Sequence, residues 1–187
     1  MEKQLAQVLE FHKAFNIPVL SEGEQPTQER IDLRKKLIIE EFNELKEAHE
    51  SGDIEHIAKE ACDLVYVCLG TALEFGWGNS RRLFRLSNGI GHSTQKKEII
   101  ALENAVRFFC MTMNPSTLDY IAETIDDCIS ISAKDFEQCF DEVHRSNMSK
   151  LDANGNPIYR ADGKVLKSEL YSPADLSFLK NDVKELA

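Results

Sequence analysis

The stretch LIIEEFNELKEA, residues 37–48, decides the fold, because its apolar residues recur at helical spacing and one carboxylate interrupts them. At about 100° per residue, a helix over residues 27–51 gathers five side chains into one apolar stripe: Ile31, Leu37, Ile38, Leu45 and Ala48. Glu41 falls inside this stripe, Glu44 lies on its edge, and Glu40 lies further round at the border. Packing alone does not explain a carboxylate there, because burying its charge is costly.

The next helix, expected over residues 53–75, repeats the anomaly. Within residues 61–73 the only charged residue is Asp63, and Glu60 projects from the turn before it. Residues three or four apart share a helix face. The carboxylates therefore form two clusters: Glu40, Glu41 and Glu44 on the first helix, Glu60 and Asp63 on the second.

The turn between these helices determines whether the clusters meet. Gly52 is a natural C-terminal stop and Asp53 a good N-cap, so the turn is tight and the helices are antiparallel neighbours. Glu44 and Glu60 each lie eight residues from Gly52. We therefore expect the two clusters to face each other at the same height.

Like charges in a partly apolar cleft repel each other unless cations or protons neutralise them. All the donors are oxygens, with no Cys or His at ligand spacing beside them, which favours Mg²⁺, or Mn²⁺, over zinc. Magnesium held by carboxylates commonly completes its shell with water and substrate phosphates, so an acidic protein can accept a polyphosphate through metal. An isolated EExxE pattern is also typical of a solvated helix face, and it is the second cluster that favours a metal site.

Composition narrows the class of protein. A chain of 187 residues with 42% hydrophobic residues predicts a single domain over 1–187, and its net charge of −10 argues against binding DNA or RNA. The N-terminus lacks a signal-type apolar run, and no stretch approaches the roughly 18 apolar residues of a membrane span. The cysteines form no CxxC pair and are odd in number, which suits buried thiols in a reducing compartment. We expect a cytoplasmic protein with no membrane contact.

The remaining sequence is helical almost throughout, so the fold class expected is all-α, a helical bundle. Further helices are predicted over residues 2–16, 96–113, 116–131 and 132–147. After Lys150 the periodicity stops, and DANGNP and RADGK predict turns flanking a short extended piece. Residues 150–187 are thus expected to form an irregular or hairpin-like C-terminal tail.

EEFNE at 40–44 and EACD at 60–63 resemble the EExxE and ExxD signature of the MazG-like all-α nucleoside triphosphate pyrophosphohydrolases. That superfamily includes MazG, the dimeric dUTPases and phosphoribosyl-ATP pyrophosphatase. Four further stretches are similar to its MazG-like branch: FHKAFNIP (11–18), DLVYVCLGTALEFG (63–76), FDEVHRSNMSK (140–150) and GKVLK (163–167).

The resemblance implies a helical bundle assembled as a homodimer or homotetramer. It implies hydrolysis of a (deoxy)nucleoside triphosphate to the monophosphate and pyrophosphate, a nucleotide-pool housekeeping activity. The metal ligands would then be Glu41, Glu44, Glu60 and Asp63. Glu40 and Glu41 are the catalytic candidates, with Glu40 either a further ligand or the base that takes the proton of the attacking water.

Substrate phosphates also require cations. The substrate-binding candidates are Asn147, Lys150, Lys164 and Lys167, and Arg145 is a weaker one. The turn-rich tail that carries two of these lysines suits a flap that orders over bound nucleotide. His12 and Phe15 are candidates for a base pocket, although such residues are more often core or interface. No motif indicates which nucleobase is bound.

Residues 78–133 depart from the branch pattern and form an expected helical insertion. They could cover the active site, alter the oligomer or decorate the surface; their apolar spacing favours packing. Three other functions stay open: a di-iron carboxylate bundle, for which only Asp53 with His56 and Asp141 with His144 have ExxH-like spacing; a non-catalytic oligomerisation or regulatory module; and a phosphoribosyl-ATP pyrophosphatase.

Overall fold

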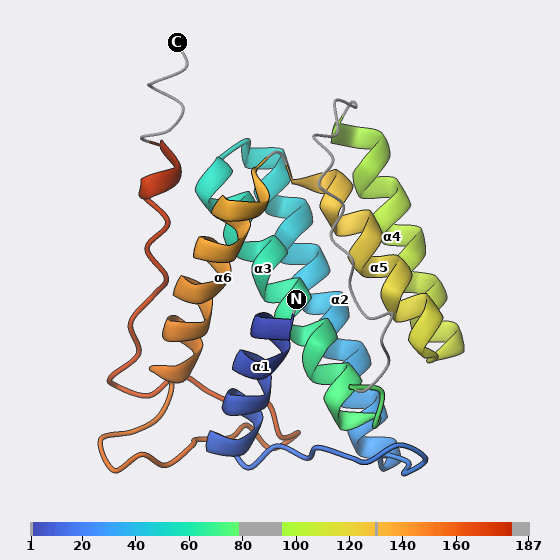
Figure 1. Ribbon diagram of the computed structural model, residues 1–187, viewed down its shortest axis with the longest axis vertical. Coiled ribbons are helices and arrows are strands. Elements are labelled where there is room, and N and C mark those ends of the chain that lie inside the picture. The colour runs from blue at the N-terminus through green and yellow to red at the C-terminus, as the bar shows by residue number, and fades with distance from the viewer. Residues whose placement is uncertain (1, 79–94, 130, 181–187) are drawn as a thin grey trace.

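The computed structural model describes residues 2–78, 95–129 and 131–180, and over these ranges the chain is all-α (Figure 1). The helices are α1 (Glu2–Ala14), α2 (Gln28–Ser51), α3 (Ile54–Glu74), α4 (Gln95–Thr112), α5 (Pro115–Cys128) and α6 (Ala133–Met148). The predicted helical bundle is confirmed, and each helix begins and ends within three residues of its predicted bounds.

Side-chain caps fix the ends of the central pair, α2 and α3. Thr27 Oγ1 accepts a hydrogen bond from the amide of Arg30. Gly52 ends α2 at φ +70°, a left-handed conformation that glycine adopts without penalty, and its amide donates to the Ala48 carbonyl at 3.2 Å. Asp53 Oδ1 then accepts from the amide of Glu55 at 3.1 Å, which starts α3. The predicted tight turn and antiparallel pairing are both confirmed.

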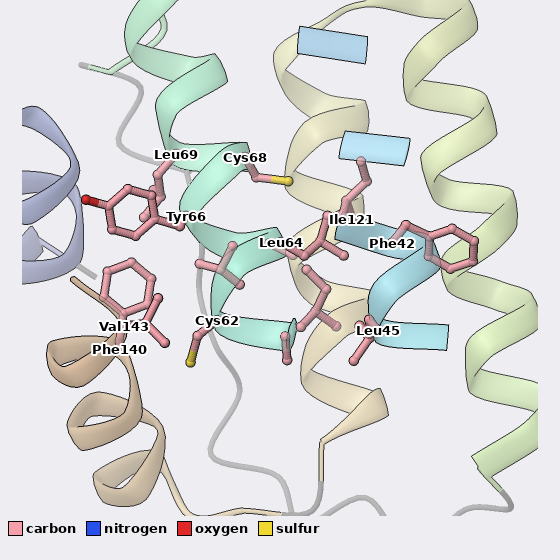
Figure 2. Packing of buried hydrophobic residues seen from close by; sticks show 14 of the residues in the cluster. Phe42, Leu45, Cys62, Leu64, Tyr66, Cys68, Leu69, Ile121, Phe140 and Val143 are labelled. Atoms are coloured by element: carbon pink, nitrogen blue, oxygen red, sulfur yellow. The ribbon is translucent and has the colours of Figure 1, made fainter. Parts of the chain in front are cut away.

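The other helices flank this pair on two sides. In Figure 1, α1 and α6 lie to one side of α3, and the α4–α5 hairpin lies to the other. All six helices contribute to one hydrophobic cluster, with Val8, Leu45, Leu64, Phe109, Ile121 and Phe140 among its fully buried members. Figure 2 shows Tyr66 facing Phe140, with ring centroids 5.5 Å apart, while Phe42 and Ile121 lie on the α4–α5 side.

The described helices of the insertion serve packing. Their buried side chains include Leu102, Val106 and Phe109 on α4 and Leu118, Ile121, Ile125 and Cys128 on α5. Helix α5 ends at Cys128, three residues before the predicted Ile131, because Ile129 turns into an extended conformation (φ −117°) and is itself buried. The part of the expected insertion over residues 79–94 lies outside the described residues.

The tail after α6 is hairpin-like, as predicted. Tyr159 and Val165 form an isolated antiparallel bridge. The amides of Arg160 and Leu166 donate across it to the carbonyls of Lys164 and Ile158, both at 2.8 Å. The chain then runs back along α6, where Leu176 and Leu179 are buried (Figure 1).

None of the helices in the described ranges is long and apolar enough to span a membrane. The five cysteines are free thiols, and four of them are buried.

Candidate active site

The packing of α2 against α3 brings the two predicted carboxylate clusters together. One oxygen from each of Glu41, Glu60 and Asp63 lies within 4.8 Å of the others. Glu44 lies at hydrogen-bonding distance from Glu60. The prediction that the clusters meet at the same height is thus confirmed. They meet because Glu44 and Glu60 lie the same number of residues from the turn at Gly52.

Lys59, which sequence analysis did not single out, is the cation in direct contact with this group. Its Nζ donates to both carboxylate oxygens of Glu60 at 2.8 and 2.9 Å and lies 2.8 Å from Asp63 Oδ2. His56 Nε2 approaches Glu60 from the turn before, at 3.2 Å. The i,i+4 spacing of Lys59 and Asp63 could have indicated this ion pair from the sequence. The same spacing is common among solvent-exposed ion pairs on helix surfaces, so it did not mark Lys59 as part of a site.

Glu40 is paired from the tail. Lys164 Nζ donates to Glu40 Oε1 at 2.6 Å across 124 residues of sequence. Two contacts hold the hairpin in this place: the Tyr159 hydroxyl donates to the carbonyl of Phe15, and Gly163, at φ +89°, lies against Arg30. A Cβ at Gly163 would lie 3.2 Å from Arg30 Nη1, so glycine suits both the turn and the close approach.

The end of α6 supplies two further predicted residues. Lys150 Nζ donates to Asn147 Oδ1 at 2.6 Å, and Asn147 is buried. Lys167 lies over the ring of Tyr171, 4.4 Å from its centroid. Arg145, the weaker candidate, is directed elsewhere: it pairs with Glu142 at 2.7 Å and donates to the carbonyl of Pro173, so it anchors the tail.

Most of these groups line one pocket of about 490 Å³, here named the charged pocket, whereas Glu40 and Glu60 are not among its lining residues. That volume falls within the range of about 300–1,000 Å³ usual for small-molecule sites. Its acidic wall comes from α2 and α3 and consists of Glu41, Glu44 and Asp63. Its basic groups are Lys59, Lys150, Arg160, Lys164 and Lys167, and Arg160 was not predicted.

A second pocket, the aromatic pocket, shares Glu41, Asp63, Asn147, Lys150, Lys164 and Val165 with the first. Its other walls include Phe11, Tyr66 and the predicted His12. Phe15, also predicted, is fully buried behind Phe11, with ring centroids 4.1 Å apart, and does not line the pocket. Phe11 takes the place expected for Phe15, because the two differ by about one helical turn.

Electrostatics single out Glu41 among the carboxylates. Burial, followed by the charges of Asp63 and Glu44, raises the pKa of Glu41 to about 8. Burial and Glu60 likewise raise the pKa of Glu44. Burial lowers the pKa of Lys59, but the attraction of Asp63 and Glu60 outweighs it and leaves the pKa raised. The acidic wall therefore holds more negative charge than the folded chain easily stabilises.

An arginine network that was not predicted borders the aromatic pocket. Arg30 binds Glu74 through two hydrogen bonds of 2.8 and 2.7 Å, and Arg34 adds a third at 3.2 Å. The Glu74 side chain is fully buried and that of Arg34 is 5% exposed. Beside them, burial and the charge of Arg34 lower the pKa of His12 to about 4, so its imidazole is neutral at pH 7.

The donor set fits Mg²⁺ or Mn²⁺. Glu41, Glu60 and Asp63 converge through carboxylate oxygens alone, and Lys59 already bridges two of them as a cation. For the di-iron alternative, the described residues show no such convergence: Asp53 caps α3, and His144 contacts Tyr66 Oη at 3.0 Å.

The described helices of the insertion take no part in either pocket. The lining residues of both come from α1 to α3, α6, the segment after α1 and the tail. Over its described residues, the insertion therefore does not cover the site.

Comparison with protein-family models matches residues 8–82 to the family described as phosphoribosyl-ATP pyrophosphohydrolase. The match spans α2 and α3 with all five candidate carboxylates. No curated protein and no solved structure gave a significant match.

Proposed function

We propose that this chain hydrolyses a nucleoside triphosphate to the monophosphate and pyrophosphate. The basis is the match of residues 8–82 to the phosphoribosyl-ATP pyrophosphohydrolase family, which the all-α MazG-like superfamily includes. The family supports a nucleotide pyrophosphohydrolase activity in general. The observation that carries the finer proposal is the charged pocket, which sets carboxylates on α2 and α3 against basic side chains from α6 and the tail.

Glu41, Glu44, Glu60 and Asp63 would hold the divalent cation, and the donor geometry described above supports this. Mg²⁺ or Mn²⁺ would supply charge neutralisation for the triphosphate and a lowered pKa for the attacking water. Because burial and neighbouring charges raise the pKa of Glu41 to about 8, cation binding there would release a proton near pH 7, which an exposed glutamate no longer carries.

Glu40 is the proposed base. It precedes Glu41 on α2, and its partner Lys164, which lines both pockets, reaches it from the tail hairpin at 2.6 Å. In the described structure, Lys164 makes the only direct ion pair to Glu40. Because the lysine side chain is flexible, its ammonium can move away from Glu40, and the freed carboxylate can then accept a proton from water. If Glu40 instead binds the cation, Glu40→Gln should lower metal affinity as well as turnover.

The basic residues would bind the triphosphate. Lys150 lies next to Asn147 at the junction of the two pockets, while Lys164 and Lys167 line the charged pocket from the tail. Lysine acts as a flexible point charge, which suits phosphate oxygens that change position during cleavage. The aromatic pocket, with Phe11, Tyr66 and neutral His12, would accept the base.

We also propose the homodimer or homotetramer that the resemblance implies. Helix α4 exposes Ile100, Phe108 and Met111, with 53, 52 and 82% of their surface accessible, which is consistent with a covered apolar face. Light scattering coupled to size-exclusion chromatography gives the mass directly, and a monomer would contradict this part.

Product analysis tests the activity. The protein is incubated with each ribo- and deoxyribonucleoside triphosphate and with phosphoribosyl-ATP, in Mg²⁺ or Mn²⁺, with EDTA controls. We expect monophosphate and pyrophosphate in equal amounts, abolished by EDTA, with the fastest substrate defining the base. Turnover of phosphoribosyl-ATP alone would favour the second candidate, to which the family description points. Absence of turnover would favour a non-catalytic module.

A further inference from the structure

Lys59 makes closer contact with the candidate metal ligands than any other cation in the described structure. Its ammonium bridges Glu60 and Asp63, with one contact at 2.9 Å and two at 2.8 Å. These are two of the four carboxylates proposed to bind the divalent cation. The ammonium of Lys59 therefore lies between Glu60 and Asp63, where the two negative charges would also stabilise a small metal cation most strongly.

The other lysines at the site are engaged differently. Lys164 pairs with Glu40 at 2.6 Å, and Lys150 donates to Asn147 at 2.6 Å. In the described ranges, the ion pairs to Glu60 and Asp63 come from Lys59 and from His56, which touches Glu60 only. Lys59 is thus the single side chain that links both carboxylates.

The position of Lys59 allows it to leave. Its side chain is 34% exposed, whereas that of Glu60 is 5% exposed and that of Asp63 is 18% exposed. The lysine stem is flexible and lines the charged pocket, so its ammonium can turn toward the pocket while the carboxylates stay fixed on α3.

We propose that Lys59 is an internal counter-ion, which orders Glu60 and Asp63 in the metal-free protein and is displaced when a divalent cation binds. This inference rests on the metal site of the proposed function. The ammonium and the cation require the same carboxylate oxygens, and they repel each other. Lys59 therefore stabilises the metal-free site and weakens metal binding by the same interaction.

Lys59→Met tests the proposal, because methionine keeps much of the stem and removes the charge. Lys164→Met is the matched control: it removes a positive charge from the same pocket, but one paired with Glu40. Binding of Mn²⁺ is measured without nucleotide, by following free Mn²⁺ with electron paramagnetic resonance. We expect Lys59→Met to lower the Kd for Mn²⁺ about fivefold relative to wild type, since a partly exposed ion pair is lost, and Lys164→Met to lower it less.

Thermal melting supplies the second readout. In EDTA, Lys59→Met should melt below wild type, because Glu60 and Asp63 lose their counter-ion. Saturating Mn²⁺ should remove that difference, whereas a purely structural salt bridge would leave it unchanged. Lys59→Arg keeps the charge and should melt like wild type in EDTA.

Two results would overturn the proposal: a Kd for Lys59→Met equal to or above that of wild type, or an equal gain in Lys164→Met, which would reflect pocket charge alone. Failure of the underlying metal site is distinguishable, because then wild type itself shows no saturable Mn²⁺ binding. In that case both the metal site and the displacement of Lys59 are rejected.

Discussion

The α2–α3 pair buries charge in two regions and balances it differently in each. In the arginine region, at the end of the pair away from Gly52, Glu74 is fully buried and receives three hydrogen bonds from Arg30 and Arg34. In the carboxylate region, about three turns back along α3 and near the middle of both helices, an oxygen of Asp63 lies within 4.8 Å of one on each of Glu41 and Glu60. The arginine region is neutralised inside the chain, whereas the carboxylate region keeps a surplus of carboxylates.

The difference distinguishes a structural ion pair from a candidate functional site. Glu74 has cations of its own, so no outside partner is needed and its loss affects folding. The raised pKa of Glu41 shows that the other carboxylates are not fully compensated. A surplus of buried charge is costly unless an external ion is bound, and this supports a metal site there.

The largest expected effect is in the arginine region, around Glu74. Glu74→Gln should lower the free energy of unfolding by about 3–5 kcal/mol, because it leaves the buried Arg34 and the partly buried Arg30 without their carboxylate. Urea denaturation with and without Mn²⁺ measures this, and the metal should not restore the loss. Glu123→Gln on the exposed face of α5 is the control. A loss of unfolding free energy no larger than the control's would remove the contrast between the arginine region and the carboxylate region.

In the carboxylate region, around Asp63, a substitution should affect turnover. Asp63→Asn should reduce pyrophosphate release by at least about 100-fold, because a carboxylate ligand becomes a neutral amide. Its metal-free thermal stability should stay close to that of wild type, since the mutation removes a repelling charge together with one contact to Lys59. Asp141→Asn, an exposed partner of Lys3, is the control. A fully active Asp63→Asn would reject the metal-site assignment.

The tail gives an intermediate effect. Lys164→Met should raise the KM for nucleotide about 10-fold, the value of one charge-assisted hydrogen bond, without weakening Mn²⁺ binding. Steady-state kinetics and metal titration separate the two. Lys97→Met on α4, outside both pockets, should behave as wild type. An unchanged KM in Lys164→Met would reject the role of the tail in binding phosphate.

The last prediction is a pH dependence from Glu41. Its pKa in the folded chain is about 8, against 4.5 as the ordinary value, so the folded state binds more protons between these values. The resulting stabilisation is complete below pH 4.5 and is lost as pH rises through 8. Urea denaturation in EDTA at pH 5.5 and pH 8.5 should show this decline, and Glu41→Gln should reduce it. An identical decline in Glu41→Gln would show that other groups cause it.

Much of the fold could be predicted because its determinants are local. Gly52 and Asp53 occupy the caps predicted for them, and Thr27 and Ser132 cap the helices predicted to begin at those residues. Each acts through residues at most four positions away. The insertion's packing face was also predicted, since apolar spacing on a helix is local. The early end of α5 was not, because the burial of Ile129 depends on what the chain meets in space.

The site shows the same division. Counting from Gly52 placed Glu44 opposite Glu60 correctly. Lys59 was missed, since a lysine near an aspartate on a helix surface is ordinary. Phe11 was missed in favour of Phe15, because the two lie one turn apart on the same face and only the packing around them decides which one lines the pocket.

The sequence by itself determined the helices, their caps and the two carboxylate clusters, because helical periodicity and end signals act over a few residues. Only the tertiary structure decided which cation meets which carboxylate. Lys164 reaches Glu40 across 124 residues, and Arg30 reaches Glu74 across 44. Such pairings depend on the register of packed helices and on the path of the tail, and no local pattern encodes either.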